Sequence, residues 1–273
     1  MRLFHRITFL FVVVLVLSTG VSCAEDYLDL TAKSVLVYDI TTDRVLYAKN
    51  PKVKLPAAST IKLMTALITI DNYQIVKKCK ATSRAFNFPY KKYLKKGSEY
   101  TTDDLLRALL LASSNDAANV LAEGVAGSMD DFVAQMNDKA SALGAIDTIF
   151  ANPSGLTDKK VPQCTTAYDL CRIMKRFLRY PRLYGMISEH SNVIKGSDGS
   201  WVFLQNHNRL MRRYPKTVVG KTGYTNLARH CFVGFSTVPR KRYIFVILGA
   251  ERPWQDMSKL LHYTGCIDRI VER

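Results

Sequence analysis

The sequence predicts one α/β domain of the α+β type, in which strands from both ends of the chain form an antiparallel sheet. Strand-like runs lie at 33–48 and again at 202–249, whereas helical patterns dominate the residues between them. At 273 residues, of which 48% are hydrophobic and 23% are charged, the chain can bury a sizeable core. We therefore expect flanking helices, with an active groove between a sheet edge and the central helical region.

Residues 1–24 have the three-part pattern of a secretory signal peptide. Arg2 and Arg6 precede the apolar run 7–17, and small residues follow it up to Ala24. We expect cleavage after Ala24 and export to the periplasm or the outer face of the cytoplasmic membrane; lipidation of Cys23 and uncleaved retention are the alternatives. Residues 25–273 show no repeat or linker, so they are expected to form a single domain with no added C-terminal domain.

The mature chain is strongly basic. Loss of Arg2 and Arg6 leaves 37 basic against 23 acidic residues, a net charge of +14. Outside the cytoplasm such a protein is attracted to carboxylate-bearing wall polymers and to anionic lipid head groups, so peripheral contact with an anionic membrane is expected. Nucleic acid is not an expected partner, because an exported chain without a recognition motif does not meet it.

The cysteines and histidines do not suggest a metal site. Five cysteines remain once Cys23 is removed, and an odd number cannot pair completely. None has Cys-x-x-Cys spacing, so we expect mostly buried thiols, with one disulfide left open as an alternative. The five histidines are scattered, and His207 and His230 are interpreted as structural or surface residues. We expect no metal and no cofactor.

Strands and then a helix are predicted for the first part of the chain. The strand-like runs 33–39 and 44–48 flank a short hairpin connection. A helix is predicted to begin near Ser59 and to continue through the apolar run 61–68. The region 74–100 shows no clear period and is expected to hold loops and small strands.

Helices dominate the middle of the chain, and strands return after it. Caps and apolar periodicity predict helices at 105–112, 117–125, 128–144, 166–180 and 183–188. Strands are predicted at 202–204, 218–223, 231–238 and 243–249, followed by an amphipathic closing helix at 257–271.

Ser59 and Lys62 are the first candidates for chemistry. They lie three residues apart at a helix start, so their side chains share one face. An amine is a poor base at its ordinary pKa of roughly 10.4, so Lys62 could activate Ser59 only if burial or a neighbouring cation removed its proton. The pair alone is weak evidence, because a helix-capping serine with a solvated lysine gives the same pattern.

Two further motifs strengthen the pair. Ser113-x-Asn115 falls on a break between predicted helices, where side chains can point into the groove. Lys221-Thr222-Gly223 falls on a predicted strand, where the glycine lets a substrate backbone approach closely. Motifs of these three kinds are associated with serine β-lactamases and penicillin-binding proteins.

With these motifs the chain resembles the D-alanyl-D-alanine carboxypeptidases, the low-molecular-mass penicillin-binding proteins, over about residues 30–265. The other segments that look like landmarks of that family are 45–50, 56–65, 152–156, 166–170, 206–210 and 220–225. The resemblance implies a β-lactamase/DD-peptidase-like fold and a peptidoglycan stem peptide ending in D-Ala-D-Ala as substrate. It also implies inhibition by β-lactams.

The resemblance implies a role for each matching residue. Ser59 would be the nucleophile, Lys62 its base, and Ser113 the relay of a proton to the leaving amine. Asn115 would hold the substrate amide, and Lys221 would depress the pKa of Lys62. Thr222 and Arg252 would contact the terminal carboxylate of the substrate, and Gly223 would let the substrate backbone approach closely. The N–H groups of Ser59 and Tyr224 would form an oxyanion hole.

Some features depart from the family pattern. Gln163 and Cys164 stand in a segment that often reads His-Ser-Thr-Ala, and Arg229 or His230 occupies a position where glycine is common. These departures bear on cleft shape and substrate preference. The added β-rich domain and amphipathic membrane helix usual in the family are not expected within these 273 residues.

Three other functions use the same motifs. A DD-endopeptidase that cuts peptidoglycan cross-links would need the same residues. A class A β-lactamase needs a glutamate for deacylation, but no Glu occurs between Glu123 and Glu189. A non-catalytic wall-binding protein is the remaining alternative, although all of the motifs are intact.

Overall fold

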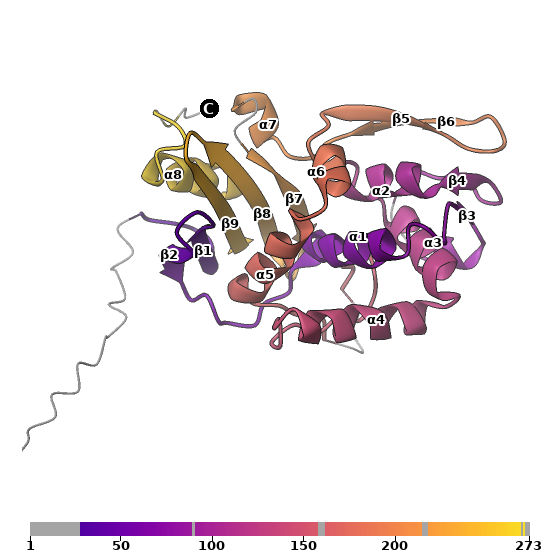
Figure 1. Ribbon diagram of the computed structural model, residues 1–273, viewed down its shortest axis with the longest axis horizontal. Helices are drawn as coiled ribbons and strands as arrows, with labels where there is room; N and C mark the ends of the chain where they lie inside the picture. Colours follow the sequence, from indigo (N-terminus) through magenta and orange to yellow (C-terminus); the bar gives the residue numbers. More distant parts are fainter. Residues whose placement is uncertain (1–27, 89–90, 158–161, 215–217, 269, 271–273) are drawn as a thin grey trace, which may run out of the picture.

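The computed structural model describes residues 28–88, 91–157, 162–214, 218–268 and 270; the predicted signal peptide therefore lies outside the described residues. A five-stranded antiparallel sheet has the strand order β2-β1-β9-β8-β7, so the first two strands of the chain pair with its last three (Figure 1). Its strands are β1 (Ser34–Asp39), β2 (Arg44–Lys49), β7 (Val218–Thr225), β8 (Arg229–Val238) and β9 (Lys241–Ala250). The predicted sheet built from both ends of the chain is confirmed.

Both faces of the sheet are covered, which explains why β9 is apolar along most of its length. Val246 and Leu248 on β9 belong to the core shared with the central helices, whereas Phe245 and Ile247 pack on the opposite face. The first face is covered by α5 (Ala167–Phe177) and the second by α8 (Pro253–Tyr263). Burial on both faces fixes the register of the strand, because a slip by one residue would exchange the two sets of side chains.

The central helical region packs around α1, in which every residue from Lys62 to Thr69 is buried. Capping side chains define the starts of its neighbours: Thr101 accepts from Asp104 N at 3.1 Å, and Ser114 accepts from Ala117 N at 3.0 Å. The helical elements of this region are η1 (Ala58–Ile61), α1 (Lys62–Asp71), η2 (Arg84–Phe86), α2 (Thr102–Leu110), α3 (Asn115–Ala126), α4 (Met129–Ala142) and α6 (Pro181–Ile187). Within the described part of the chain, no helix has the length and apolar character needed to cross a membrane.

Two small hairpins stand apart from the main sheet. One joins β3 (Lys78–Lys80) and β4 (Glu99–Thr101), and the other joins β5 (Ser191–Lys195) and β6 (Trp201–Gln205). The sequence had predicted a strand at 202–204 but not its partner β5. The second hairpin lies beside α2 at the upper edge of Figure 1, away from the five-stranded sheet.

The closing helix differs from its prediction at 257–271. It begins at Pro253, whose fixed φ and missing N–H suit the first turn of a helix, and it ends at Tyr263. Gly265 follows with φ +69°, a left-handed conformation that stops helices. The prediction therefore placed the start of the helix four residues too late and its end eight residues too late.

Candidate active site

Ser59 lies in the short 3₁₀ helix η1, directly before α1, and Lys62 is the first residue of α1. This short turn places the two side chains on one face, with Lys62 Nζ 2.8 Å from Ser59 Oγ. Ser59 is half-buried, whereas the side chain of Lys62 has no exposed surface. In the predicted pair, the hydroxyl of Ser59 therefore faces a cleft, whereas the amine of Lys62 lies in the protein interior.

Lys62 has three hydrogen-bond partners, and their chemistry defines the state of its amine. Its Nζ lies 2.8 Å from Asn115 Oδ1 and is also in contact with the Ser154 carbonyl oxygen. These two oxygens only accept hydrogen bonds, whereas the Ser59 hydroxyl can also donate. A neutral amine would give its two hydrogens to the carbonyl oxygens and turn its lone pair towards the proton of Ser59.

The electrostatic surroundings favour this neutral form. Burial lowers the pKa of Lys62 well below 10.5, and the charge of Lys221 lowers it further, while Asp116 acts weakly in the opposite direction. Lys221 is itself buried, which lowers its pKa to about 7. The site thus contains two lysines that burial drives towards losing their protons, and the charge of Lys221 adds to this effect at Lys62.

The second motif lies on the turn between α2 and α3. Ser113 has φ +56°, and Asn115 opens α3. Next to them, buried Asp116 accepts from the N–H groups of Tyr93 (2.6 Å) and Leu94 (2.8 Å), which holds the loop around residue 93 against the cleft. The sequence did not indicate this anchoring role of Asp116, because the role depends on contacts that are distant in the chain.

The third motif lies on β7, the edge strand of the sheet nearest the catalytic turn. A Cβ on Gly223 would stand 2.9 Å from Ser59 N and 3.0 Å from Ala57 O, so only glycine lets the strand approach the turn this closely. Thr222 is half-buried beside it, and exposed Tyr224 packs on the His230 ring with centroids 4.6 Å apart. The predicted groove between the sheet edge and the helices is where these elements meet.

A loop at 152–156 completes the site from a third direction. Asn152 Oδ1 accepts from Ser154 N (3.1 Å) and Gly155 N (2.8 Å), and Pro153 O accepts from Thr65 Oγ1 on α1 at 2.7 Å. Gly155 has φ +81°, and a Cβ there would overlap the Ala58 carbonyl oxygen. The sequence marked this segment as a landmark of the family, but did not indicate that the Ser154 carbonyl binds Lys62.

The departure from the family pattern at Gln163 lies next to this loop. Gln163 Oε1 accepts from the backbone N–H groups of Ala151 (3.0 Å) and Asn152 (3.2 Å). Its neighbour Cys164 is a free thiol, as are the other four cysteines of the described chain, of which Cys79, Cys171 and Cys231 are buried. Gln163 therefore fastens the loop that supplies the Ser154 carbonyl.

The cleft has a volume of about 1090 Å³ and brings most of the predicted residues together. Its lining includes Ser59, Ser113, Asn115, Thr222, Gly223, Tyr224 and Arg252. Lys62 and Lys221 lie buried behind it. His207 and His230, which the sequence suggested were structural or surface residues, also line it.

Two arginines in the lining differ in their surroundings. Arg252 is exposed at the start of α8, and its backbone N–H donates to Thr31 Oγ1 at 2.9 Å. Arg213, which sequence reasoning missed, has a buried Nη2 with no hydrogen-bond partner among the described residues. It had no motif to mark it, because it stands in a run of basic residues that resembles a solvated surface.

A serine at a helix start, a buried lysine beside it and a Lys-Thr-Gly edge strand define a serine acyl-transfer site of the penicillin-binding class. The family model described as D-alanyl-D-alanine carboxypeptidase matches residues 20–252. The chain belongs to this family, as the sequence motifs had predicted.

Individual relatives agree with the family match. The chain is 36% identical over 242 residues to the D-alanyl-D-alanine carboxypeptidase DacB2 of Mycobacterium tuberculosis, covering 85% of this chain and 81% of the relative. It is 32% identical to DacF of Bacillus subtilis, of which it spans 61% of the length. A D-alanyl-D-alanine endopeptidase of Pseudomonas aeruginosa is 31% identical, with 81% of this chain and 72% of the relative covered.

Solved structures share the fold. A D-alanyl-D-alanine carboxypeptidase from Mycobacterium tuberculosis has a TM-score of 0.81 and 32% identity, with 88% of this chain and 92% of the other covered. Penicillin-binding protein D2 of Listeria monocytogenes, solved in a cefotaxime-bound form, has a TM-score of 0.75 and 27% identity, with 85% and 96% covered. The predicted β-lactamase/DD-peptidase-like fold is confirmed.

Proposed function

We propose that this protein is a serine D-alanyl-D-alanine carboxypeptidase that removes the terminal D-Ala from peptidoglycan stem peptides through an acyl-enzyme. The observation that carries the proposal is the buried Lys62 amine, 2.8 Å from the Ser59 hydroxyl and bound to two carbonyl oxygens. The amine takes the Ser59 proton as Oγ attacks the carbonyl carbon of the penultimate D-Ala. The N–H groups of Ser59 and Tyr224 stabilise the oxyanion.

The remaining residues of the site handle the leaving group and the substrate. When the C–N bond breaks, Ser113 passes a proton to the departing amine, and water later hydrolyses the ester on Ser59. Because Asn115 Oδ1 already accepts from Lys62, its NH₂ group is the part that binds the substrate amide. Thr222 binds the terminal carboxylate, with Arg252 as a second contact.

Acylation of Ser59 tests this proposal. We expect incubation with benzylpenicillin to add one drug mass to Ser59, and incubation with a peptide ending in D-Ala-D-Ala to release D-alanine. In Ser59→Ala both reactions are lost. The drug adduct is expected to be long-lived, because the sequence offers no glutamate between Glu123 and Glu189 to drive deacylation. Rapid penicillin turnover, or full activity of Ser59→Ala, would refute the assignment.

We further infer export and single-domain organisation. The basic and apolar pattern of residues 1–24 supports a cleaved signal, followed by one catalytic domain over 25–273. A net charge of +14 supports loose attachment to anionic lipid at the outer face of the cytoplasmic membrane. Mass spectrometry of the protein from fractionated cells tests export and signal cleavage: a cytoplasmic protein that retains residues 1–24 would contradict both.

A further inference from the structure

The outer face of the β5–β6 hairpin carries apolar side chains that are exposed to solvent. The strand register pairs Val193 with Phe203 and Lys195 with Trp201, and because side chains alternate along a strand all four point to the same side. Val193 is 49% exposed, Trp201 66% and Phe203 63%. A contiguous exposed apolar patch marks a surface that contacts a partner. We call these four residues the hairpin face.

The rest of the hairpin is fastened to the protein, so its outer face is a fixed platform. On the inner side, Ile194 and Leu204 are buried in the core beside α2. At the turn, Ser197 N donates to Glu99 O at 2.9 Å, and Ser197 Oγ accepts from Glu99 N at 2.9 Å. The hairpin runs along the upper edge of the molecule (Figure 1), where an extended surface can approach it.

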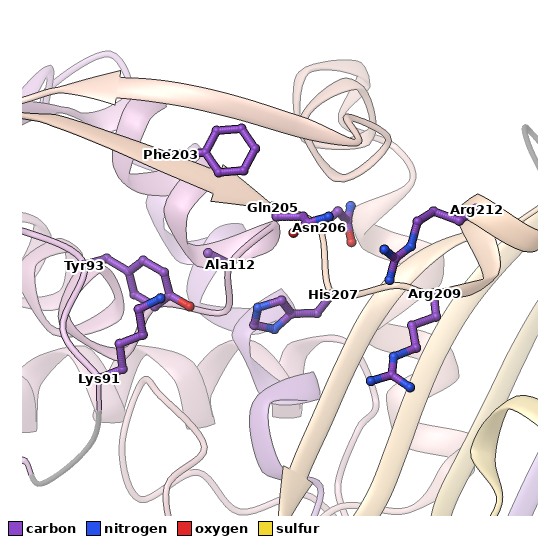
Figure 2. Close-up of a pocket in the computed structure, with 9 residues that line it drawn as sticks. All are labelled: Lys91, Tyr93, Ala112, Phe203, Gln205, Asn206, His207, Arg209 and Arg212. Carbon is purple, nitrogen blue, oxygen red and sulfur yellow. The ribbon is translucent and has the colours of Figure 1, made fainter.

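Basic side chains surround the hairpin face. Lys195 Nζ lies 5.0 Å from the centre of the Trp201 ring. Phe203 lines a pocket of about 390 Å³ whose walls include three further cations, Lys91, Arg209 and Arg212. Figure 2 shows Lys91 on one side of this pocket and the two arginines on the other. No acidic residue lines the pocket, and in the part of the chain that the structure describes none of these four cations forms an ion pair.

The carboxylates at the two ends of the hairpin are neutralised. Asp198 in the turn pairs with Lys95 at 2.8 Å, and Glu189, just before β5, pairs with Arg107 at 3.1 Å. The hairpin face therefore combines exposed aromatic rings with positive charge that lacks a counterion.

This combination favours one kind of partner. A second copy of the chain would bring the same cations against each other. A carboxylate-bearing wall polymer matches the charge but offers no apolar layer for the rings of Trp201 and Phe203. An anionic bilayer offers both, because tryptophan occupies the interface between head groups and acyl chains, and lysine and arginine extend from there to the lipid phosphates.

We propose that the hairpin face docks this protein on a bilayer that contains anionic phospholipid. Trp201 and Phe203 enter the interface between head groups and acyl chains, while Lys195 and the cations of the adjoining pocket contact the phosphates. Attraction by the net charge of the protein has no preferred face, whereas docking through the hairpin gives the protein one orientation. Under the proposed function, on which this consequence rests, the cleft is held at the membrane surface, because Ala112, next to Ser113, lines the same pocket as Phe203.

Fluorescence of Trp201 tests the docking directly. The chain has only two tryptophans, so Trp254→Phe leaves Trp201 as the single reporter. The exported protein is mixed with vesicles of phosphatidylglycerol and phosphatidylcholine, or of phosphatidylcholine alone. With the anionic vesicles we expect a blue shift of the Trp201 emission and quenching by lipids that carry bromine on their acyl chains. Attachment through another part of the chain would not produce this signal.

Sedimentation with the anionic vesicles measures the affinity. Trp201→Ala is expected to weaken binding about tenfold, because a large exposed ring no longer leaves water. Arg212→Gln is expected to weaken it about fivefold, the scale of one basic residue at an anionic surface. Two matched controls are expected to change binding by less than about twofold. Ile146→Ala removes a side chain that is 76% exposed in the loop after α4, and Arg44→Gln removes an exposed arginine from β2, at the sheet edge opposite β7.

Several outcomes would overturn the proposal. They are a Trp201 emission that does not respond to anionic vesicles, equal binding by Trp201→Ala and Ile146→Ala, and equal binding to vesicles without anionic lipid. Dimerisation, or binding to lipid-free peptidoglycan, that Trp201→Ala abolishes would assign the hairpin face to another partner. Ser59→Ala is expected to bind vesicles as the wild type does. Absence of carboxypeptidase activity in a protein that docks normally would therefore refute the proposed function and not the docking.

Discussion

Replacing Lys62 by methionine is expected to slow acylation of Ser59 by about 10³-fold, since positioned general bases typically contribute factors of this order. Methionine fills a similar volume but has no lone pair basic enough to take the hydroxyl proton. Stopped-flow measurement of the reaction with a chromogenic β-lactam checks this expectation, because acylation can be followed separately from ester hydrolysis.

Folding is not expected to limit this experiment. The substitution leaves Asn115 Oδ1 without its Lys62 partner, a cost of roughly 1–3 kcal/mol for an unsatisfied group, whereas the Ser154 carbonyl can still accept from Ser59 Oγ at 3.4 Å. Removing a buried amine that is costly to charge offsets part of this cost. Lys52→Met, on an exposed lysine, serves as the matched control. A Lys62→Met protein that folds and is acylated at a rate within tenfold of the wild type would exclude Lys62 as the base.

Gly155→Ala is expected to destabilise the protein by about 3 kcal/mol or more, through backbone strain at a positive φ and overpacking together. The added methyl group would collide with the Ala58 carbonyl oxygen, next to the nucleophile. Because Ser154, the preceding residue, supplies a carbonyl to Lys62, the fraction that stays folded is expected to bind penicillin more slowly. Urea unfolding and drug labelling measure the two effects.

Gly127→Ala separates strain from collision. Gly127 has φ +76°, close to the +81° of Gly155, but a Cβ there would have open space around it. This control therefore carries the backbone cost alone, about 1 kcal/mol, and leaves the site intact. If the two variants lost equal stability and labelled at equal rates, contact between the 152–156 loop and the catalytic turn would have no energetic importance.

Local signals were sufficient to predict much of the fold and the identity of the candidate site. Strand-like apolar runs predicted β1, β8 and β9, and capping residues such as Thr101 and Thr166 predicted helix starts to within one to three residues. The order of the motifs predicted that Ser59, Ser113 and Lys221 share one site, although they are far apart in the sequence. The structure contains all three in and behind one cleft.

Contacts between distant segments could not be predicted in the same way. The Ser154 carbonyl, the Asp116 anchor and the buried Nη2 of Arg213 act through backbone atoms or through neighbours that no local pattern identifies. β5 was missed because its residues, Ser191–Lys195, include only two apolar side chains, so alternation was weak. The pairing of β5 with β6 supplies the stability that its own sequence does not indicate.

The pH dependence of acylation by a β-lactam tests the central claim, a neutral Lys62 amine, most directly. Protonated Lys62 cannot accept the Ser59 proton, so the rate falls as pH falls through the pKa of Lys62. Burial and the charge of Lys221 lower that pKa, and we therefore expect the rate to reach its plateau well below pH 10.5. Lys221→Met removes the repelling charge, which Lys221 carries chiefly below its pKa of about 7, and is expected to move the acid limb to higher pH. A rate that keeps rising up to pH 10.5, with no shift in Lys221→Met, would contradict the claim.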